Sequence, residues 1–275
     1  MIKSVIQEIR PKHWLKNIFI LAPFLFTPEK WGINNIISII VGFILFSFSA
    51  SLIYIFNDLM DLESDKKRSV NRRRAYANGE ISKNIMIILM ISSIVITFVF
   101  SIIFDKNFFY IIVLYIILNI FYSIYIKRIK YINFSIIAIG FLLRILSGCV
   151  IINVSPSYWI LVMTFLLTYY VSIIKFIVNN KQMKPDMVII RILSCLIPII
   201  YLFYTISPET MLHFGNCFLL FSLIPIVLGF VYTNKKIKIS NDIDIVNFFT
   251  DKIYWSIYIL WLIMVIIPVS IRYFI

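Results

Sequence analysis

Long apolar runs separated by short charged segments dominate this 275-residue chain, of which 61% is hydrophobic. Runs of about 18 or more apolar residues indicate helices that cross a membrane. Nine candidate spans cover residues 13–28, 34–57, 84–104, 107–126, 132–152, 157–178, 190–207, 211–233 and 254–273. The sequence therefore predicts an all-α integral membrane protein with nine transmembrane helices, and it excludes an ordinary soluble domain.

Positive charge is distributed unevenly over the connections between these spans. Of the 26 Lys and Arg residues, 22 lie in the N-terminal segment and in every second connection along the chain. Cytoplasmic connections of membrane proteins carry such an excess. We therefore expect a multi-pass protein of the cell (inner) membrane with a cytoplasmic N-terminus. The same asymmetry explains the formal net charge of +13 without a nucleic acid partner.

No linker rich in Pro, Gly or Ser divides the chain. Residues 1–275 are therefore predicted to form a single polytopic membrane domain. The sequence leaves open whether the chain forms a homo-oligomer.

Acidic residues are concentrated just after the second candidate span. Asn57 is followed by Asp58, Asp61 and Asp65 at offsets of 1, 4 and 8 residues. Continued as helix, these spacings place the three carboxylates on one face, where they repel one another unless a cation lies between them. Oxygen ligands of this kind suit Mg²⁺, which commonly bridges carboxylates to substrate phosphates. A polar loop after a membrane helix is the alternative, but the concentration of acids in a basic, apolar chain favours a metal–diphosphate site.

A dense basic run follows the acids within residues 66–74. Acids followed by such a run can hold a metal–diphosphate and a second phosphate together, and Arg72 and Arg74 are the candidates for substrate contact. The alternative is a topology signal that also attracts anionic lipid. A turn at Gly79 and a helix start capped by Ser82 are predicted to follow.

Charged residues also occur inside two predicted spans. Arg144 lies within 132–152, and Lys16 lies beside Asn17 within 13–28. A charge in a span is costly and usually faces an interior cavity or a partner. Arg144 could instead pair with a buried carbonyl or extend to the membrane surface. Lys175, at the end of the sixth span, fits a site and the general charge asymmetry equally well.

The pattern Asn57-Asp58-x-x-Asp61-x-x-x-Asp65 resembles the first aspartate-rich motif of the UbiA-type intramembrane prenyltransferase superfamily. This resemblance implies a bundle of nine helices with a site that opens to the cytoplasm. Residues 10–17, 71–79 and 140–148 resemble, more narrowly, its decaprenyl-phosphate phosphoribosyltransferase branch. The match covers residues 10–150 and thins toward the C-terminus.

The chain departs from the superfamily pattern at the second motif, which normally brings Tyr, then Lys, then Asp about six residues on. Tyr122 or Tyr125 and Lys127 are present, but Asn133 stands at the aspartate position. Aromatic prenyltransferases of the superfamily use two acidic clusters to hold a prenyl diphosphate through metal ions. The single cluster here counts against prenyl transfer to an aromatic ring.

The resemblance implies transfer of 5-phosphoribosyl from phosphoribosyl diphosphate to a polyprenyl phosphate, for synthesis of a cell-envelope polysaccharide. Mg²⁺ would be held by Asp58, Asp61 and Asp65 and would neutralise the diphosphate leaving group. The expected catalytic residues are Asp58, Asp61, Lys16, Lys127 and Arg144. The expected substrate-binding residues are Asn17, Asn57, Arg72, Arg74, Tyr122, Arg128 and Lys175. A Mg²⁺-dependent aromatic prenyltransferase of quinone or haem synthesis and a non-catalytic membrane carrier are the alternatives.

Overall fold

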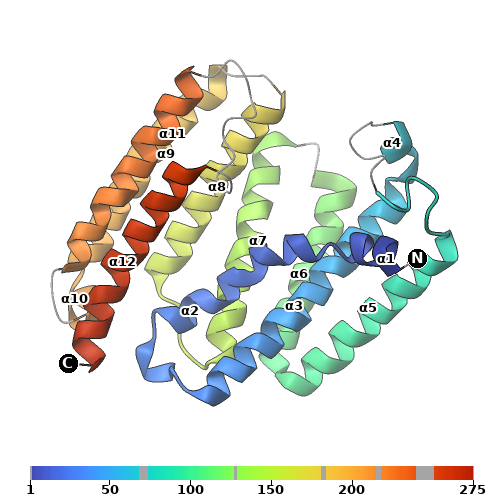
Figure 1. The fold of residues 1–275 in the computed structure, drawn as a ribbon, viewed down its shortest axis with the longest axis horizontal. Coiled ribbons are helices and arrows are strands. Elements are labelled where there is room, and N and C mark those ends of the chain that lie inside the picture. Colours follow the sequence, from blue (N-terminus) through green and yellow to red (C-terminus); the bar gives the residue numbers. More distant parts are fainter. Residues whose placement is uncertain are drawn as a thin grey trace. The chain divides into compact units, whose positions relative to one another are not determined.

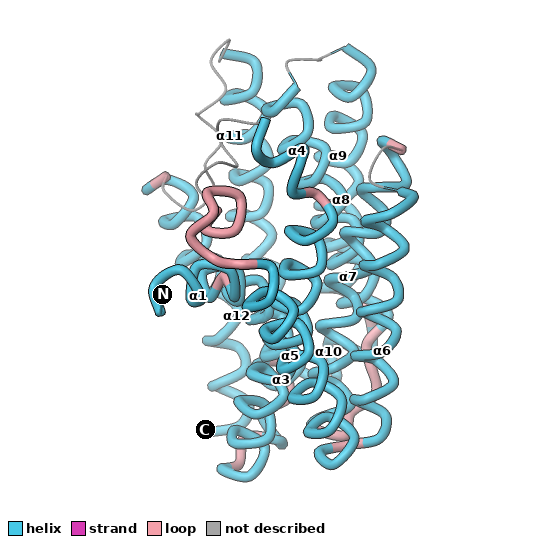
Figure 2. The backbone as a smooth tube through the Cα atoms, turned by 90° about the vertical axis from the view of Figure 1, so that its right-hand side faces the viewer, coloured by secondary structure: helices cyan, strands magenta, loops and turns pink. Residues whose placement is uncertain are grey.

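The computed structural model describes residues 2–67, 74–126, 129–180, 184–214, 218–239 and 251–274. Within these ranges every regular element is a helix, and no strand is present (Figure 1; Figure 2). The chain forms two compact units, Met1–Pro156 and Ser157–Ile275. That residues 1–275 make up one functional domain stays a prediction.

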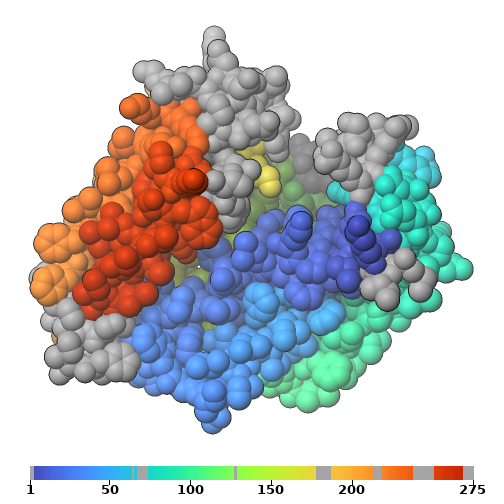
Figure 3. All heavy atoms as spheres, in the orientation of Figure 1, coloured from blue at the N-terminus to red at the C-terminus, as the bar shows by residue number. Residues whose placement is uncertain are grey.

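The first unit is organised around α3 (Ile33–Met60), which contacts the N-terminal segment and the other long helices of the unit. The N-terminal segment consists of α1, η1 and α2, where η marks a 3₁₀ or π helix. Figure 3 shows its dark blue residues at the surface of the unit, beside the lighter blue of α3. The other elements of the unit are α1 (Ile2–Ile9), η1 (Pro11–Leu21), α2 (Ala22–Leu25), η2 (Pro28–Lys30), α4 (Leu62–Lys67), α5 (Lys83–Phe104), α6 (Lys106–Phe121), η4 (Tyr122–Ile126) and α7 (Lys130–Ile151).

Local sequence signals account for where two of these helices begin. Ser82 caps α5 by accepting a hydrogen bond from the Ile85 N–H at 3.4 Å, and Asp105 caps α6 by accepting from the Phe108 N–H at 2.7 Å. Gly79 has a φ of 79° in the turn before α5, a conformation that glycine adopts at little cost. The predicted turn at Gly79 and the predicted cap at Ser82 are confirmed.

The acidic stretch does not continue as one helix. α3 ends at Met60, Asp61 follows with φ −97° and ψ 11°, and the short helix α4 begins at Leu62. The N–H of Asp61 bonds the carbonyl of Asn57, and the N–H of Asp65 bonds the carbonyl of Asp61. The expectation of one uninterrupted helical face is therefore wrong at Asp61, where the backbone bends.

Close packing holds the first unit together, because lipid is as apolar as the helix surfaces and gives little drive for them to associate. Ile20, Phe46, Phe108 and Ile112 are completely buried in one cluster. Gly148 of α7 lies so close to η1 that a Cβ atom there would be 2.1 Å from the carbonyl oxygen of Ile20. This glycine therefore lets α7 approach the backbone of η1.

The second unit is a bundle of four long helices with two short elements. Its members are α8 (Tyr158–Asn180), α9 (Lys184–Ile206), α10 (Pro208–Phe214), η5 (Phe218–Ser222), α11 (Leu223–Ile239) and α12 (Lys252–Phe274). Buried polar contacts join its helices, among them a 2.6 Å hydrogen bond between Tyr201 and Ser222. Asn234 of α11 donates to Ser194 of α9 at 2.9 Å.

Seven helices among the described residues are long and apolar enough to cross a membrane. They are Ile33–Met60, Lys83–Phe104, Lys106–Ile126, Lys130–Ile151, Tyr158–Ile177, Met187–Ile206 and Phe218–Ile237. Large apolar side chains such as Ile103 and Ile117 are exposed on them, which suits contact with lipid. These features indicate a multi-pass membrane protein. The predicted span at 13–28 coincides with the shorter elements η1 and α2. The predicted span at 254–273 lies on α12, whose apolar stretch Lys252–Pro268 is shorter than the other seven. The count of nine and the orientation of the N-terminus therefore stay predictions.

Candidate active site

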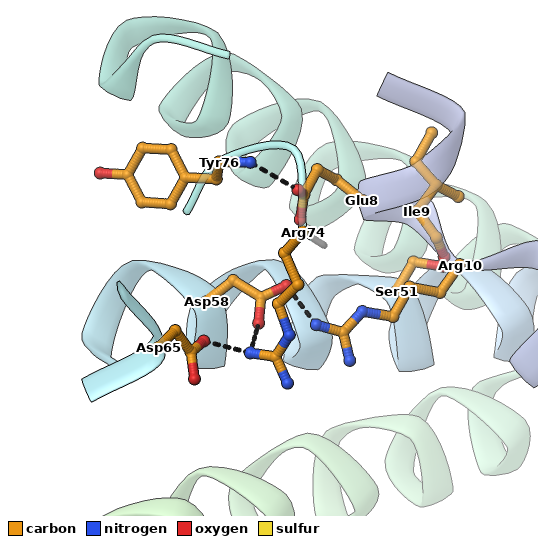
Figure 4. Close-up of polar contacts among 8 residues, drawn as sticks. All are labelled: Glu8, Ile9, Arg10, Ser51, Asp58, Asp65, Arg74 and Tyr76. Atoms are coloured by element: carbon orange, nitrogen blue, oxygen red, sulfur yellow. Dashed lines mark hydrogen bonds and ion pairs between the residues drawn. The ribbon is translucent and has the colours of Figure 1, made fainter. Parts of the chain in front are cut away.

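Two carboxylates and two guanidinium groups meet at the end of α3. Asp58 and Asp65 are 2% and 4% exposed. Arg74 Nη1 lies 2.6 Å from Asp58 Oδ1 and also pairs with Asp65 Oδ2, while Arg10 Nη2 pairs with Asp58 Oδ2 (Figure 4). We call these four residues the acid–arginine centre. They come from three separate stretches of the chain, so the fold rather than the local sequence assembles them.

A tight turn carries Arg74 to the acids. The Asn78 N–H bonds the Arg74 carbonyl at 3.0 Å, and the Glu80 N–H bonds the Ala75 carbonyl at 2.9 Å. Ala75 and Tyr76 are buried in a small cluster with residues of α3 and α5. The turn is therefore anchored by its own hydrogen bonds and by packing, and this fixes where the Arg74 side chain begins.

The N-terminal segment delivers Arg10 from the other direction. Arg10 has φ 55° and ψ 57° between α1 and η1, a left-handed conformation that is uncommon for a residue with a side chain. Its guanidinium lies 4.8 Å from the centroid of the Tyr54 ring on α3, within reach of a cation–π contact. The Ser51 hydroxyl donates to the Ile9 carbonyl at 2.7 Å. These contacts fix the chain on both sides of the Asp58 ion pair.

Glu8 is an acid of this region that the sequence reasoning missed. It is 1% exposed, and its Oε1 accepts a hydrogen bond from the Tyr76 N–H at 2.9 Å. Burial raises the pKa of Glu8 to about 7, and a hydrogen bond with Asp58 adds to the increase, whereas the Tyr76 N–H and Arg10 oppose it. The available signal was that Glu8 is the only acidic residue among residues 1–28.

A second polar network surrounds Arg144, which is 6% exposed within the first unit. Its Nε donates to Asn17 Oδ1 at 2.8 Å, its Nη1 to the Gly140 carbonyl at 2.7 Å and its Nη2 to the Tyr115 hydroxyl at 3.2 Å. Asn17 in turn donates to Ser47 at 2.9 Å. We call these residues the Arg144 network. Tyr115 was missed by the sequence reasoning, since nothing in its local pattern distinguishes it from the other aromatic residues of the spans.

The charge of Arg144 is held by neutral groups. The described residues that hydrogen-bond its guanidinium offer an amide, a carbonyl and a hydroxyl oxygen. The rings of Phe46, Tyr115 and Phe141 each have their centroid 5.1 Å from Arg144 Cζ. A buried cation is costly, and it usually has polar partners or faces an interior cavity. The Gly140 carbonyl is a partner of the kind that the alternative interpretation of the sequence expected for Arg144.

α3 connects the two polar regions. Ser47, Ser51, Tyr54 and Asp58 follow one another at helical spacing along one side of α3. With a rise of 1.5 Å per residue, the Cα atoms of Ser47 and Asp58 are roughly 16 Å apart. Trp14 donates to Ser51 at 2.9 Å, so the N-terminal segment follows this polar side of the helix. The arrangement places the acid–arginine centre and the Arg144 network at different positions along one helix.

The remaining predicted site residues are placed less centrally. Lys16 is exposed next to the buried Asn17, and Asp61 is half-buried at the bend after α3. Tyr122 is half-buried and donates to Asn133 Oδ1 at 3.2 Å, so the amide that replaces the family's aspartate holds this tyrosine. Lys175 is exposed on α8 in the second unit. The predictions for Arg72, Lys127 and Arg128 lie outside the described residues.

The acid–arginine centre fits a divalent cation that shares its coordination with a substrate. Among the described residues, no group of three or more His, Cys, Asp or Glu side chains is arranged to hold a metal ion. Asp58 and Asp65 nevertheless converge on one guanidinium nitrogen, and the neighbouring Asn57 Oδ1 is buried without a hydrogen-bond partner. Mg²⁺ is usually held by one or two carboxylates together with waters and substrate phosphates. Asp58 and Asp65 match the two carboxylates of such a site.

Comparison with known proteins identifies the family of this chain. The sequence model of the UbiA prenyltransferase family matches residues 18–257. The chain belongs to the UbiA prenyltransferase family. Its fold agrees, because the structure of a UbiA homolog from Archaeoglobus fulgidus bound to GPP and Mg²⁺ superimposes with a TM-score of 0.70. That superposition covers 97% of this chain and 98% of the archaeal chain at 14% sequence identity.

Two curated relatives of this UbiA family member are more similar in sequence. The decaprenyl-phosphate phosphoribosyltransferase of Corynebacterium glutamicum is 29% identical over 162 residues, which are 58% of this chain and 49% of that protein. The uncharacterized protein y4nM of Sinorhizobium fredii is 28% identical over 175 residues, 62% of this chain and 33% of that protein. The chain thus spans about a third to a half of the length of these relatives.

Proposed function

We propose that this protein transfers 5-phosphoribosyl from phosphoribosyl diphosphate to a polyprenyl phosphate and releases diphosphate. The observation that carries the proposal is the pairing of one acidic cluster with a cationic site deeper along α3. Two anionic substrates need two such sites, and the second-motif position holds Asn133 bonded to Tyr122 rather than a second acid. The name of the C. glutamicum relative supports the same substrates.

The donor would bind at the acid–arginine centre. Asp58, Asp65 and Asn57 would hold Mg²⁺, with Asp61 completing the set, and the ion would neutralise charge on the departing diphosphate. Arg10 and Arg74 lie beside the acids and have guanidinium groups that match phosphate oxygens. Arg72 would join them at the 5-phosphate. The carboxylates then serve to hold the donor, and no proton has to move at this end of the site.

The acceptor headgroup would bind toward the Arg144 network. A polyprenyl phosphate is already an anion, so it needs cations to place it and no strong general base. Lys16 and Asn17 belong to η1, and Arg144 fixes η1 through Asn17. Lys127 and Arg128 would add positive charge, and Tyr122 a hydroxyl. A substrate role for Lys175 stays a prediction. In-line attack on C1 of an α-configured donor would invert the anomeric centre to β.

The charge distribution supports a site on the cytoplasmic side of the cell (inner) membrane. Diphosphate donors are made in the cytoplasm. We propose a cytoplasmic N-terminus, nine spans and one functional domain over residues 1–275. The product would serve synthesis of a cell-envelope polysaccharide. The proposal holds for a monomer and for a homo-oligomer alike.

Crossing two donors with two acceptors tests this function. Purified full-length protein in detergent is given labelled phosphoribosyl diphosphate or a labelled prenyl diphosphate, each with a polyprenyl phosphate or an aromatic acid. Label should enter a phosphorylated lipid only in the first pairing. Asp58→Asn should abolish this transfer, whereas Asp105→Asn should not, since asparagine caps α6 as well as aspartate does.

The other outcomes separate the alternatives. Transfer only from prenyl diphosphate to the aromatic acid would replace the proposal by aromatic prenyl transfer. Lipid binding with no transfer in any pairing, unchanged by Asp58→Asn, would indicate a non-catalytic carrier.

A further inference from the structure

The two acids of the acid–arginine centre are covered by the chain's own cations. Asp58 has both carboxylate oxygens engaged, Oδ1 by Arg74 and Oδ2 by Arg10, and Asp65 shares the same Arg74 nitrogen. The acid side chains are almost fully buried, whereas the Arg10 and Arg74 side chains are 17% and 30% exposed. Figure 4 shows the two guanidinium groups lying against the carboxylates.

These arginines are mounted on two segments that are held to each other. Arg10 directly follows α1. Glu8 of α1 accepts a hydrogen bond from the N–H of Tyr76, which lies two residues after Arg74. Ser4 of α1 also donates to Glu80 at 3.0 Å, on the other side of the same turn. These contacts fix the backbone at Arg10 and Arg74. A cation that displaced either arginine would therefore have to move its side chain while the backbone stays in place.

We propose that Arg10 and Arg74 keep a bare divalent cation away from Asp58 and Asp65, and release these acids only when the cation arrives with a diphosphate group. A metal ion alone would take the carboxylates and leave two partly buried guanidinium groups without acceptors. A diphosphate brings oxygen acceptors in the same step, with bidentate geometry that arginine favours. Metal and diphosphate therefore bind cooperatively, and the coupling acts equally on both.

This inference rests on one part of the proposed function, namely that Asp58 and Asp65 bind the metal ion. It requires neither ribose nor a lipid acceptor. Aromatic prenyl transfer would leave it standing, because a prenyl diphosphate carries the same diphosphate group. Its test therefore uses inorganic diphosphate and a spectroscopic metal ion, and its outcome is independent of which transfer the protein performs.

The primary experiment measures Mn²⁺ binding to metal-free, full-length protein in detergent by electron paramagnetic resonance of free Mn²⁺. Arg10→Gln combined with Arg74→Gln removes both guanidinium groups and should tighten binding of Mn²⁺ alone by about tenfold or more. Lys12→Gln combined with Lys83→Gln is the matched control, since it removes two exposed positive charges that lie two residues after Arg10 and nine residues after Arg74 in the sequence. Binding to the control should stay within about twofold of the wild type, because exposed charges interact weakly.

A second measurement follows the protein-bound fraction of labelled inorganic diphosphate as Mn²⁺ is added. Wild-type protein should retain diphosphate at least about tenfold more tightly with Mn²⁺ than without it, and the double arginine variant should lose most of that gain. Arg10→Met with Arg74→Met serves as a second variant if the glutamine pair does not fold. It should also bind Mn²⁺ alone more tightly than the wild type does, since it removes the same two guanidinium groups.

The inference is overturned if the arginine variants bind Mn²⁺ alone no more tightly than the wild type does, or no more tightly than the control with Lys12→Gln and Lys83→Gln does. It is equally overturned if wild-type protein binds Mn²⁺ as tightly without diphosphate as with it. Phosphoribosyl transfer could fail while the coupling holds, and in that case only the proposed function falls.

Discussion

A single methyl group added at Gly148 should separate α7 from the N-terminal segment. An ideal Cβ there would lie 2.1 Å from the Ile20 carbonyl oxygen, 3.0 Å from the Ile20 carbonyl carbon and 3.1 Å from Pro23 Cδ. Atoms in ordinary contact are about 3.5 Å apart, so α7 and η1 must part by roughly 1.4 Å. The obstacle is backbone, which cannot rotate away as a side chain would.

Gly140→Ala is the matched control, because it adds the same methyl group two turns earlier on the same helix. A Cβ at Gly140 would meet only Arg144 Nη1, at 3.6 Å. Both substitutions gain helix propensity of up to about 1 kcal/mol, and this gain cancels when the two variants are compared. The difference between them is the overpacking cost, about 1–3 kcal/mol of unfolding free energy.

The assay is unfolding in mixed micelles followed by tryptophan fluorescence, together with phosphoribosyl transfer at saturating substrates. Gly148→Ala should unfold at lower denaturant than Gly140→Ala. It should also lose up to about 100-fold in activity, because the shift of η1 stretches the 2.8 Å bond between Asn17 and Arg144. Equal stability and activity of the two variants would refute the close approach of α7 and η1.

Three further predictions concern single side chains. The folded chain raises the pKa of Glu8 from 4.5 to about 7, so it binds a proton that the unfolded chain has lost. With a metal chelator present, the unfolding free energy should therefore fall as pH rises from 4.5 to about 7. The fall should be at most about 1.4 kcal/mol per pH unit. Glu8→Gln should remove this pH dependence, as measured by a series of denaturation curves at different pH values. Arg144→Met should raise KM for polyprenyl phosphate at least about tenfold and change the unfolding free energy by less than about 2 kcal/mol, because burial of the cation offsets its bonds to neutral partners. A loss of about 3–5 kcal/mol with unchanged KM would instead make Arg144 structural. Tyr122→Phe should cost about 1 kcal/mol in the same unfolding assay by removing the bond to Asn133, and no measurable cost would show that this bond is not formed.

Features that depend on neighbouring residues could be predicted from the sequence. The long apolar helices, the turn at Gly79 and the cap at Ser82 follow from local patterns, and each is found in the structure. The spacing of Asp58 and Asp65 also indicated that the two carboxylates lie close together, which they do around Arg74. The helical period still failed at Asp61, because pattern alone does not locate a bend.

Features that depend on contacts between distant residues could not be predicted in this way. Arg10 meets Asp58 across 48 positions, Glu8 meets Tyr76 across 68, and Arg144 meets Asn17 across 127. Glu8 and Arg10 look ordinary in their own stretch, and the local pattern around Asp58 and Arg144 does not reveal their partners. Only the packing of the N-terminal segment against α3 and α7 brings these residues together.

The most direct test of the central claim is the stoichiometry of one reaction. Purified protein is incubated with Mg²⁺, phosphoribosyl diphosphate and a polyprenyl phosphate, and both released diphosphate and phosphoribosylated lipid are quantified. We predict one diphosphate released for each lipid product formed, with neither produced when one substrate is omitted or when Asp58→Asn replaces the wild type. Diphosphate release without lipid product, or product formation that survives Asp58→Asn, would contradict the account.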